Sequence, residues 1–301
     1  MNVDLSQFPE LAPFFEGAEV IKSLGGLTNK NTLIQSNLGR MVLRVPGEGT
    51  EKFIRRDWEK VAATLASAIG VNVPVLYFDS KTGTQLTQFM DSAITMDSDR
   101  FKDLGAVARG AQCLRTVHES GTMFSNQFEL FQQMEKYIRV LEGAVLPNGF
   151  AEVKEGARCV KEALSQHLLP LVPCHCDPLA ENFLDTGSRM YLIDWEYAGN
   201  NDPMWDLGDL SVEAGFDETQ DQVLFDAYFS TGQGRPFDRG RMVLYKAMCD
   251  LLWTLWGVLQ HENKNPAANF WEYATMRFNR CRKLMNQDDF RVFLGDVLAG
   301  P

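Results

Sequence analysis

The stretch HCDPLAENFLDTGSRMYLIDWE, residues 175–196, contains the features on which the fold assignment depends. Two short apolar runs, 183–184 and 190–193, flank the sequence DTGSR, whose aspartate, glycine and serine are typical of a tight turn, so we predict a β-hairpin. The two arms are nearly equal in length if the chain reverses near Gly187 or Ser188. The hairpin is therefore expected to bring Asn182, which enters one strand, beside Asp194, which leaves the other.

The polar residues at the open end of this hairpin suit the chemistry of phosphoryl transfer. Asn182 and Asp194 offer hard oxygen ligands of the kind that Mg²⁺ takes together with water and phosphate oxygens. Asp177 lies on the preceding loop, where it is free to accept the proton of an attacking hydroxyl. A lone His-x-Asp would indicate only a solvated loop before an ordinary strand, but the combined spacing favours the catalytic interpretation.

The composition is that of a globular protein, and its 301 residues suit one large or two closely packed domains. A net charge of −11 argues against a nucleic-acid partner and is compatible with a cationic small molecule. We find no apolar stretch that approaches the roughly 20 residues needed to span a bilayer, and no secretory signal in MNVDLSQFPEL. We therefore expect a cytoplasmic protein without a membrane partner.

The six cysteines show no disulfide pattern, so we expect free thiols. Cys174 and Cys176 flank His175, but no second Cys/His pair has the spacing of a zinc site. A zinc site at this position is therefore disfavoured.

The chain changes character near residue 90. Its first part predicts the order β-β-β-α-β-β, with strands at 18–24, 31–37 and 40–46, a helix over 54–70, and two strands within 74–90. The second part is mostly helical, for example over 98–120, 128–143 and 239–262. We predict an α+β fold with two lobes, a β-rich nucleotide lobe (1–90) and a helical catalytic and substrate lobe (91–301). The cleft between such lobes is a favoured place for a ligand.

Three motifs in this order, H-x-D-x-x-x-x-N, I-D-W-E and N-D-P-x-W-D-L, resemble the choline/ethanolamine kinase branch of the aminoglycoside-phosphotransferase superfamily, which has a protein-kinase-like fold. The resemblance covers nearly the whole chain. It implies that Asp177 is the catalytic base, that Asn182 and Asp194 bind magnesium, and that His175 is a structural residue of the catalytic loop. It also implies that Asp206 braces this loop from a following helix, although Asp206 alone is equally explained as a helix N-terminal acid.

A glycine-containing turn between the first two predicted strands, LGGLTNKN (24–31), resembles the phosphate loop of this family. Gly25 and Gly26 would let backbone amides approach phosphate oxygens, and Thr28 and Asn29 add side-chain donors. The loop is not the G-x-G-x-x-G of protein kinases, and as a bare motif a Gly-Gly turn is more often only a turn.

The third strand carries Arg44 where protein kinases have a lysine, and the following helix carries its expected partner Glu59. Arginine can hold phosphate oxygens with two nitrogens, and the resemblance implies an arginine in this role. Arg55 and Arg56 are competing candidates, but solvated basic residues are routine at a helix start. We expect the inter-lobe hinge at 88–90, where the backbone of Gln88 and Met90 would meet adenine.

A late helix carries Trp253 and Trp256, which three-residue spacing puts on one face. Two indole rings can bind a quaternary ammonium by cation–π attraction, although spacing alone favours core aromatics. The resemblance implies a substrate wall here, with Glu213 near the ammonium and Glu196 also in the substrate pocket. Glu218 stands where the family usually has a further aromatic residue, and Phe216 is the nearest ring.

These features predict an ATP- and Mg²⁺-dependent kinase that phosphorylates the hydroxyl of choline or a related amino alcohol. Ethanolamine, thiamine or an aminoglycoside are alternative acceptors, and the aminoglycoside is disfavoured by the lack of a broad acidic surface near the C-terminus. A catalytically silent binder of nucleotide or cation is a different class of alternative. A metal-dependent hydrolase is disfavoured because no histidine pair lies near Asp177. The oligomeric state is open, and a dimer is one option.

Overall fold

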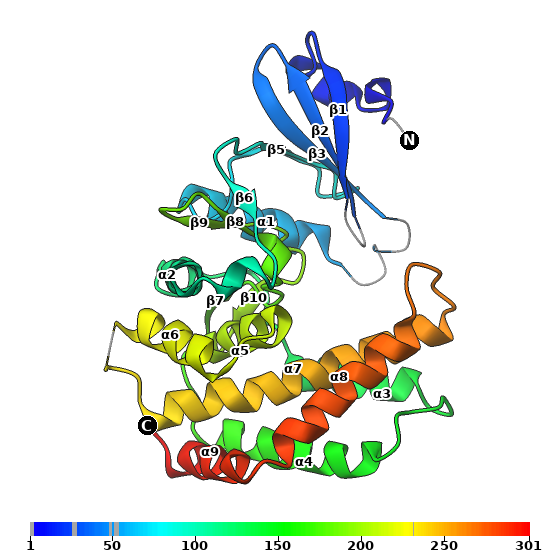
Figure 1. The fold of residues 1–301 in the computed structure, drawn as a ribbon. Helices are drawn as coiled ribbons and strands as arrows, with labels where there is room; N and C mark the ends of the chain where they lie inside the picture. Colours follow the sequence, from blue (N-terminus) through cyan, green and yellow to red (C-terminus); the bar gives the residue numbers. More distant parts are fainter. Residues whose placement is uncertain (1–2, 26–28, 48–49, 51–53, 231) are drawn as a thin grey trace.

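The computed structural model of the protein describes residues 3–25, 29–47, 50, 54–230 and 232–301. A twisted sheet forms one end of the molecule and a set of helices forms the other (Figure 1). The sheet region contains β1 (Glu19–Gly25), β2 (Asn29–Ser36), β3 (Gly39–Pro46), α1 (Arg56–Ala68), β4 (Val75–Phe78) and β5 (Gln85–Gln88). Its strands pair antiparallel in the order β1-β2-β3-β5-β4. This matches the predicted element order, with β2 beginning slightly before residue 31.

One face of this sheet packs on a small apolar core to which the short helices η1 (Leu5–Gln7) and η2 (Pro9–Phe14) contribute. Its fully buried members are Leu11, Ile34, Met41, Leu43 and Leu86. Successive residues of a strand point to opposite faces, so the burial of Met41 and Leu43 on one face of β3 directs Arg44 to the other. That other face lies toward α1 and the rest of the molecule.

The larger region is mostly helical, in agreement with the predicted α+β class. Its helices are η4 (Arg100–Lys102), α2 (Leu104–His118), α3 (Leu130–Val140), α4 (Phe150–Gln166), η5 (Ala180–Asn182), α5 (Pro203–Ala214), α6 (Glu218–Phe229), α7 (Pro236–Glu262), α8 (Phe270–Met285) and α9 (Asp288–Ala299). Its short strands are β6 (Ile94–Thr95), β7 (Val172–Cys174), β8 (Phe183–Asp185), β9 (Met190–Leu192) and β10 (Gly199–Asn201). The helices predicted over 98–120, 128–143 and 239–262 correspond to α2, α3 and α7.

The long helix α7 lies at the centre of the helical region, against α5, α8 and α9. It contains an 18-residue window, of mean hydropathy 1.3, that is long and apolar enough to cross a membrane by composition. This window was not predicted from the sequence. Because 89% of this window is buried inside the protein, α7 is a core helix of the helical region.

The hairpin predicted at 183–193 is present as β8 and β9. Phe183 pairs with Leu192 and Asp185 with Met190, and the chain reverses at residues 186–189, where Gly187 has a φ of +83°. One step before β8, the amide of Ile193 donates to the carbonyl of Asn182 at 2.9 Å. The fold-back therefore brings Asn182 and the Asp194 end of the chain side by side, as predicted.

Helix α1 belongs to the sheet region by sequence but packs into the larger core. Its buried residues Ala62, Ala63 and Ala66 are members of the same apolar cluster as α2, α5 and α7. Figure 1 shows α1 between the sheet and the helices, beside β8 and β9. α1 therefore connects the β3 face that carries Arg44 with the hairpin.

Candidate active site

The loop that follows β7 carries Asp177 and is held from below by Asp206 of α5. The amide of His175 donates to Asp206 Oδ2 at 2.7 Å, and the amide of Cys176 donates to Oδ1 at 2.8 Å. Asp206 is fully buried, so it is a structural anchor for the loop and not a solvated helix-terminal acid. Cys176, directly before Asp177, has a φ of +67°, a left-handed conformation that non-glycine residues rarely adopt without external support.

His175 is fully buried and its imidazole Nε2 lies 2.9 Å from the carbonyl oxygen of Ile193. A carbonyl only accepts, so Nε2 carries the hydrogen. The ring also packs edge-on against Trp195, with centroids 4.8 Å apart. Burial lowers the pKa of His175, which keeps the ring neutral. His175 thus ties the loop to the hairpin end.

Asn182 and Asp194 are oriented so that each has an oxygen available to a cation. The amide nitrogen of Asn182 donates to the carbonyl oxygen of Asp177 at 3.1 Å, which turns the amide oxygen of Asn182 away from that carbonyl. Asp194 has a φ of +68°, and its Oδ1 accepts from Arg44 at 2.6 Å. The other carboxylate oxygen of Asp194, Oδ2, takes no part in this bond with Arg44. Hard oxygen donors of this kind suit Mg²⁺.

Arg44 connects the sheet to this hairpin end. Its side chain is buried, and besides Asp194 it pairs with Glu59 of α1, whose carboxylate is also buried. The contact between Arg44 and Glu59 is the one expected from the kinase pattern. Because one guanidinium serves two carboxylates, the three elements β3, α1 and the end of β9 share a single charge network.

Arg56 is a member of the same network, contrary to our expectation of a solvated basic residue. It is 6% exposed, and its Nη1 lies 2.6 Å from Glu59 and 3.3 Å from Glu196. The expectation was wrong because Arg56 begins α1 on the side that faces the hairpin, where burial is offset by the two acids. Composition at a helix start carries no information about which side of the helix is buried.

Glu196 lies close to Glu59 and Asp194. Its Oε2 accepts from Asn29 and from Arg56, both at 3.3 Å. Glu59, Asp194 and Glu196 have carboxylate oxygens within 4.8 Å of one another. Burial and the nearby Asp194 raise the pKa of Glu196. Glu196 therefore contacts Asn29 and Arg56, and its negative charge also acts on Asp177.

Asp177 is partly buried and faces several other acids. Burial raises its pKa well above the ordinary range, and the like charges of Glu213, Asp194 and Glu196 add to this effect, while Arg277 opposes it. A carboxylate with an elevated pKa is a stronger proton acceptor. This environment also attracts cations, because a bound positive charge relieves the repulsion.

The expected nucleotide residues are described only in part. Gly25 ends β1 with a φ of +84°, and its carbonyl accepts from Asn31 at 3.0 Å. Asn29 begins β2 and is buried, with its side chain directed to Glu196. Gly26 and Thr28 lie outside the described residues. Gln88 ends β5 and pairs with Met41, and Met90 follows in the connection to the helical region.

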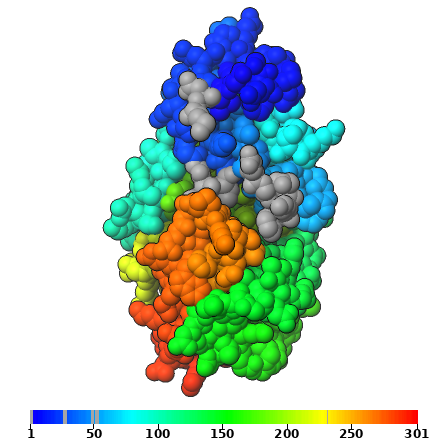
Figure 2. Space-filling model, turned by 90° about the vertical axis from the view of Figure 1, so that its right-hand side faces the viewer, coloured from blue at the N-terminus to red at the C-terminus, as the bar shows by residue number. Residues whose placement is uncertain are grey.

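The expected substrate tryptophans belong to a cluster of rings contributed by three separate segments. Trp253 packs edge-to-face on Tyr197 and on Trp256, with centroids 5.6 and 6.0 Å apart. Trp256 also packs on Phe270 and Tyr273. Figure 2 shows the corresponding part of α7 and α8, in orange, at the surface below the β-rich region. We call Tyr197, Trp253, Trp256, Phe270 and Tyr273 the aromatic cluster.

Glu213 lies in a buried ion-pair network next to this cluster. Its Oε2 lies 2.6 Å from Arg277, which in turn stacks over the Tyr273 ring at 4.7 Å. Asp250 pairs with Arg277 and, at 2.6 Å, with Arg280. Arg277 was not predicted as the partner of Glu213. The sequence signal that could have identified it is the four-residue spacing of Tyr273 and Arg277 on α8.

The aromatic position that Glu218 occupies is not filled by Phe216. Phe216 is buried against Phe101, with centroids 5.5 Å apart, and its amide donates to the carbonyl of Ser211. Tyr197 and Tyr273 are instead the tyrosines of the cluster, and sequence analysis missed both. Tyr197 directly follows the IDWE motif, a signal that could have identified it.

The buried Arg44–Glu59 pair of the β-rich region lies beside the loop that carries Asp177 and the hairpin end that carries Asn182 and Asp194. This arrangement is that of a kinase-like phosphotransferase of small molecules. The chain belongs to the choline/ethanolamine kinase family, whose model matches residues 20–228. It is accordingly a phosphotransferase with an alcohol group as acceptor.

Several relatives resemble the chain over most of its length. The crystal structure of a choline/ethanolamine kinase family protein from Mesorhizobium loti has a TM-score of 0.89 and 46% identity, and covers 98% of this chain and 97% of its own. Choline kinase LicA from Streptococcus pneumoniae has a TM-score of 0.79 and 29% identity, with 93% and 97% covered. A structure of LicA in complex with AMP has a TM-score of 0.77 and 28% identity, with 95% and 98% covered. Ethanolamine kinase 2 of Mus musculus is 28% identical over 87% of this chain and 75% of its own length.

Proposed function

We propose that the protein transfers the γ-phosphoryl group of ATP to the hydroxyl of choline, in the cytoplasm and with Mg²⁺ as cofactor. The observation that carries the choice of acceptor is the aromatic cluster beside the Glu213–Arg277 pair. Ring faces attract a quaternary ammonium, which carries charge but offers no N–H for a hydrogen bond. The nearby Glu213 carboxylate shares its charge with Arg277, so the ring faces supply the main attraction for this cation.

Arg44, together with the segment from Gly25 to Asn29, is proposed to hold the phosphates, with Glu59 orienting the arginine. The backbone of Gln88 and Met90 is proposed to meet adenine at the hinge between a lobe of residues 1–90 and a lobe of residues 91–301. The AMP complex of LicA supports nucleotide binding by the same fold. AMP and ATP share the adenine and ribose that such a hinge would hold.

Asn182 and Asp194 are proposed to hold Mg²⁺. Their free oxygens fit a hard cation. The surrounding charge also favours a cation, because three carboxylates stand against two guanidinium groups: Glu59, Asp194 and Glu196 against Arg44 and Arg56. When bound, the metal would neutralise charge on the transferring phosphoryl group.

Asp177 is proposed to accept the hydroxyl proton of choline as that oxygen attacks the γ-phosphorus. The new oxygen–phosphorus bond forms as the bond to the bridging oxygen breaks, and ADP leaves. The loop contacts through Asp206 and His175 would keep the Asp177 carboxylate at a constant position during this step. Such positioning contributes to rate because the hydroxyl, base and phosphate must be aligned simultaneously.

Other acceptors fit the same site less well. Ethanolamine has the same hydroxyl, but its primary ammonium favours hydrogen-bond acceptors over ring faces. An aminoglycoside carries several ammonium groups, whereas the acids here, Glu213 and Asp250, are already paired with Arg277 and Arg280. Thiamine is a cation with a hydroxyl and remains the closest chemical rival. A catalytically inactive protein that only binds nucleotide or cation is disfavoured. Such a protein would be expected to have lost at least one of the proposed base, the two proposed metal ligands and the Arg44–Glu59 pair.

The direct test is ADP release measured with a coupled assay, with choline, ethanolamine, thiamine and kanamycin compared at equal concentration and a reaction without acceptor as blank. We expect choline to give the highest kcat/KM. Higher kcat/KM with any other acceptor would contradict the proposed substrate. ADP release that is independent of acceptor would indicate a hydrolase.

A further inference from the structure

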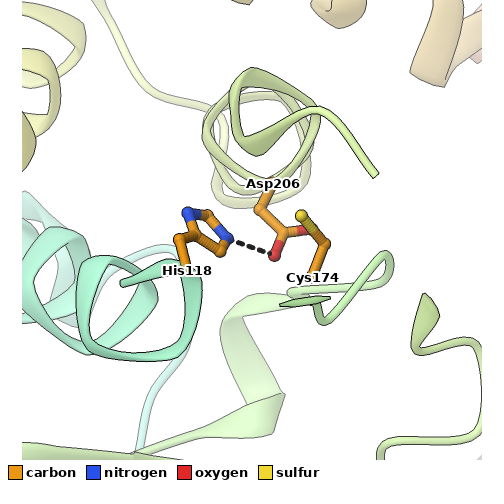
Figure 3. A group of neighbouring side chains, drawn as sticks. All are labelled: His118, Cys174 and Asp206. Carbon is orange, nitrogen blue, oxygen red and sulfur yellow. Dashed lines mark hydrogen bonds and ion pairs between the residues drawn. The ribbon is translucent and has the colours of Figure 1, made fainter. Parts of the chain in front are cut away.

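A buried histidine outside the proposed catalytic groups touches the anchor of the catalytic loop. His118 ends α2 and is 5% exposed. Its Nε2 lies 3.0 Å from Asp206 Oδ2, and its Nδ1 lies 2.9 Å from the hydroxyl of Tyr228 on α6. Figure 3 shows the imidazole directed at the Asp206 carboxylate, with Cys174 on the far side of that carboxylate. Three helices, α2, α5 and α6, thus converge on one side chain.

The hydrogen-bond roles follow from the chemistry of the partners. An ionised carboxylate only accepts, so Nε2 of His118 carries a hydrogen and donates it to Asp206. Asp206 then receives three donors: His118 and the amide of His175 at Oδ2, and the amide of Cys176 at Oδ1. With both oxygens engaged, rotation of the carboxylate would break at least one bond to the loop.

The same three residues, His118, Cys174 and Asp206, have ligand atoms close enough to surround a metal ion. Their bonding argues against one. Both nitrogens of His118 and both oxygens of Asp206 already have protein partners. Burial raises the pKa of the Cys174 thiol well above its ordinary range, which keeps it in the protonated form that binds metals poorly. The group is better explained as a hydrogen-bonded support.

We propose that His118 and Tyr228 are positioning residues for phosphoryl transfer. Tyr228 orients the imidazole, His118 orients the Asp206 carboxylate, and Asp206 clamps the amides of His175 and Cys176. That clamp holds Cys176 in its left-handed conformation and thereby sets the position of Asp177, the next residue. This inference rests on the proposed role of Asp177 as base.

The test compares three variants of the full chain: His118→Leu, which removes the donor; His118→Gln, which can return an N–H to Asp206; and Tyr228→Phe, which removes one hydroxyl. His167→Leu and Tyr191→Phe serve as controls outside the support. We expect His118→Leu to lower kcat for choline about tenfold or more, since a small misplacement of a catalytic group costs up to about 10² in rate. KM for ATP should change less than about threefold, and His118→Gln should recover most of kcat.

A second readout separates positioning from general stability. Amide hydrogen exchange in the segment 172–179 should be faster in His118→Leu and Tyr228→Phe than in the wild type, and unchanged in the controls. Equal loss of kcat in His118→Leu and His118→Gln, with no local change in exchange, would overturn the proposal. If His118→Leu does not fold, Tyr228→Phe is the test variant. Wild-type kcat and wild-type amide exchange in Tyr228→Phe would then overturn the proposal.

The failure of this inference is distinguishable from failure of the proposed function. An Asp177→Asn enzyme that turns over at the wild-type rate would remove the function on which the inference rests. An inactive Asp177→Asn beside a fully active His118→Leu would remove the inference alone.

Discussion

The Arg44 guanidinium on β3 lies 2.6 Å from Asp194 at the end of the β8–β9 hairpin, a contact between residues 150 positions apart in the chain. Arg44 also pairs with Glu59, so the sheet, α1 and the hairpin are joined by one buried charge. A ligand that binds Asp194 therefore acts on the same network that holds Arg44. This arrangement couples the proposed phosphate site to the proposed metal site.

The shared guanidinium predicts that Arg44 cannot be replaced by lysine. A single ammonium cannot reach Glu59 and Asp194 with the fork geometry of arginine, so Arg44→Lys should raise KM for ATP and lower kcat/KM by about tenfold or more. Steady-state kinetics with ATP as the varied substrate measures this. Arg55→Lys is the matched control, because Arg55 pairs with Asp57 at the exposed surface. Equal behaviour of the two variants would contradict the role of Arg44.

Asp177→Asn should abolish the base without changing the shape of the side chain. Loss of a positioned base costs about 10²- to 10⁴-fold in kcat, while nucleotide affinity should stay nearly intact. Single-turnover phosphoryl transfer and ATP titration measure the two quantities separately. Glu181, an exposed acid on the same loop, provides the control: Glu181→Gln should leave kcat and ATP affinity nearly unchanged. If kcat decreases by less than about tenfold, Asp177 is not the base.

Asn182→Leu should weaken the proposed metal site while it keeps the side-chain size. The loss of one oxygen ligand should raise the Mg²⁺ concentration for half-maximal activity by about tenfold, which corresponds to roughly 1.4 kcal/mol. Chelation by EDTA should stop turnover, and added Mg²⁺ should restore it. Binding of Mn²⁺, followed by its electron paramagnetic resonance signal, gives a readout independent of activity. Unchanged Mn²⁺ affinity in the variant would place the metal elsewhere.

Trp256→Ala should raise KM for choline by about tenfold or more while KM for ATP changes little, because a cation–π contact is worth about 1–2 kcal/mol when desolvated. Trp256 is only partly buried, so the substitution should cost less stability than a full core deletion. Trp58→Ala on the exposed side of α1 is the control. Equal increases in both KM values, together with a large fall in melting temperature, would assign Trp256 to the core.

Much of the site was predictable from local sequence, because it depends on short-range turn chemistry. The hairpin follows from two apolar runs around Gly187, and its register brings Asn182 next to Ile193 and Asp194. The glycine in the left-handed region and the equal arms determine that register with little contribution from the rest of the chain.

Other features were not predictable, because they depend on which side of a helix is buried. Arg56 and Arg55 are adjacent basic residues at the start of α1, yet one is buried among acids and the other pairs with Asp57 at the surface. Glu196 follows Asp194, the proposed metal ligand, by two residues but contacts Arg56. Local patterns cannot distinguish such neighbours, since the outcome is decided by partners far away in the chain.

The amino-acid sequence alone determined the order of the elements and the hairpin that carries the proposed metal ligands of this kinase. Hydrophobic periodicity and turn residues act over a few positions, so they can be recognised in the sequence without the tertiary structure. The tertiary structure decided the charge networks: Arg44 with Asp194, Glu213 with Arg277, and His118 with Asp206. Buried charges and polar groups must find partners in space, and the partner is chosen by helix packing that joins residues 64 to 150 positions apart.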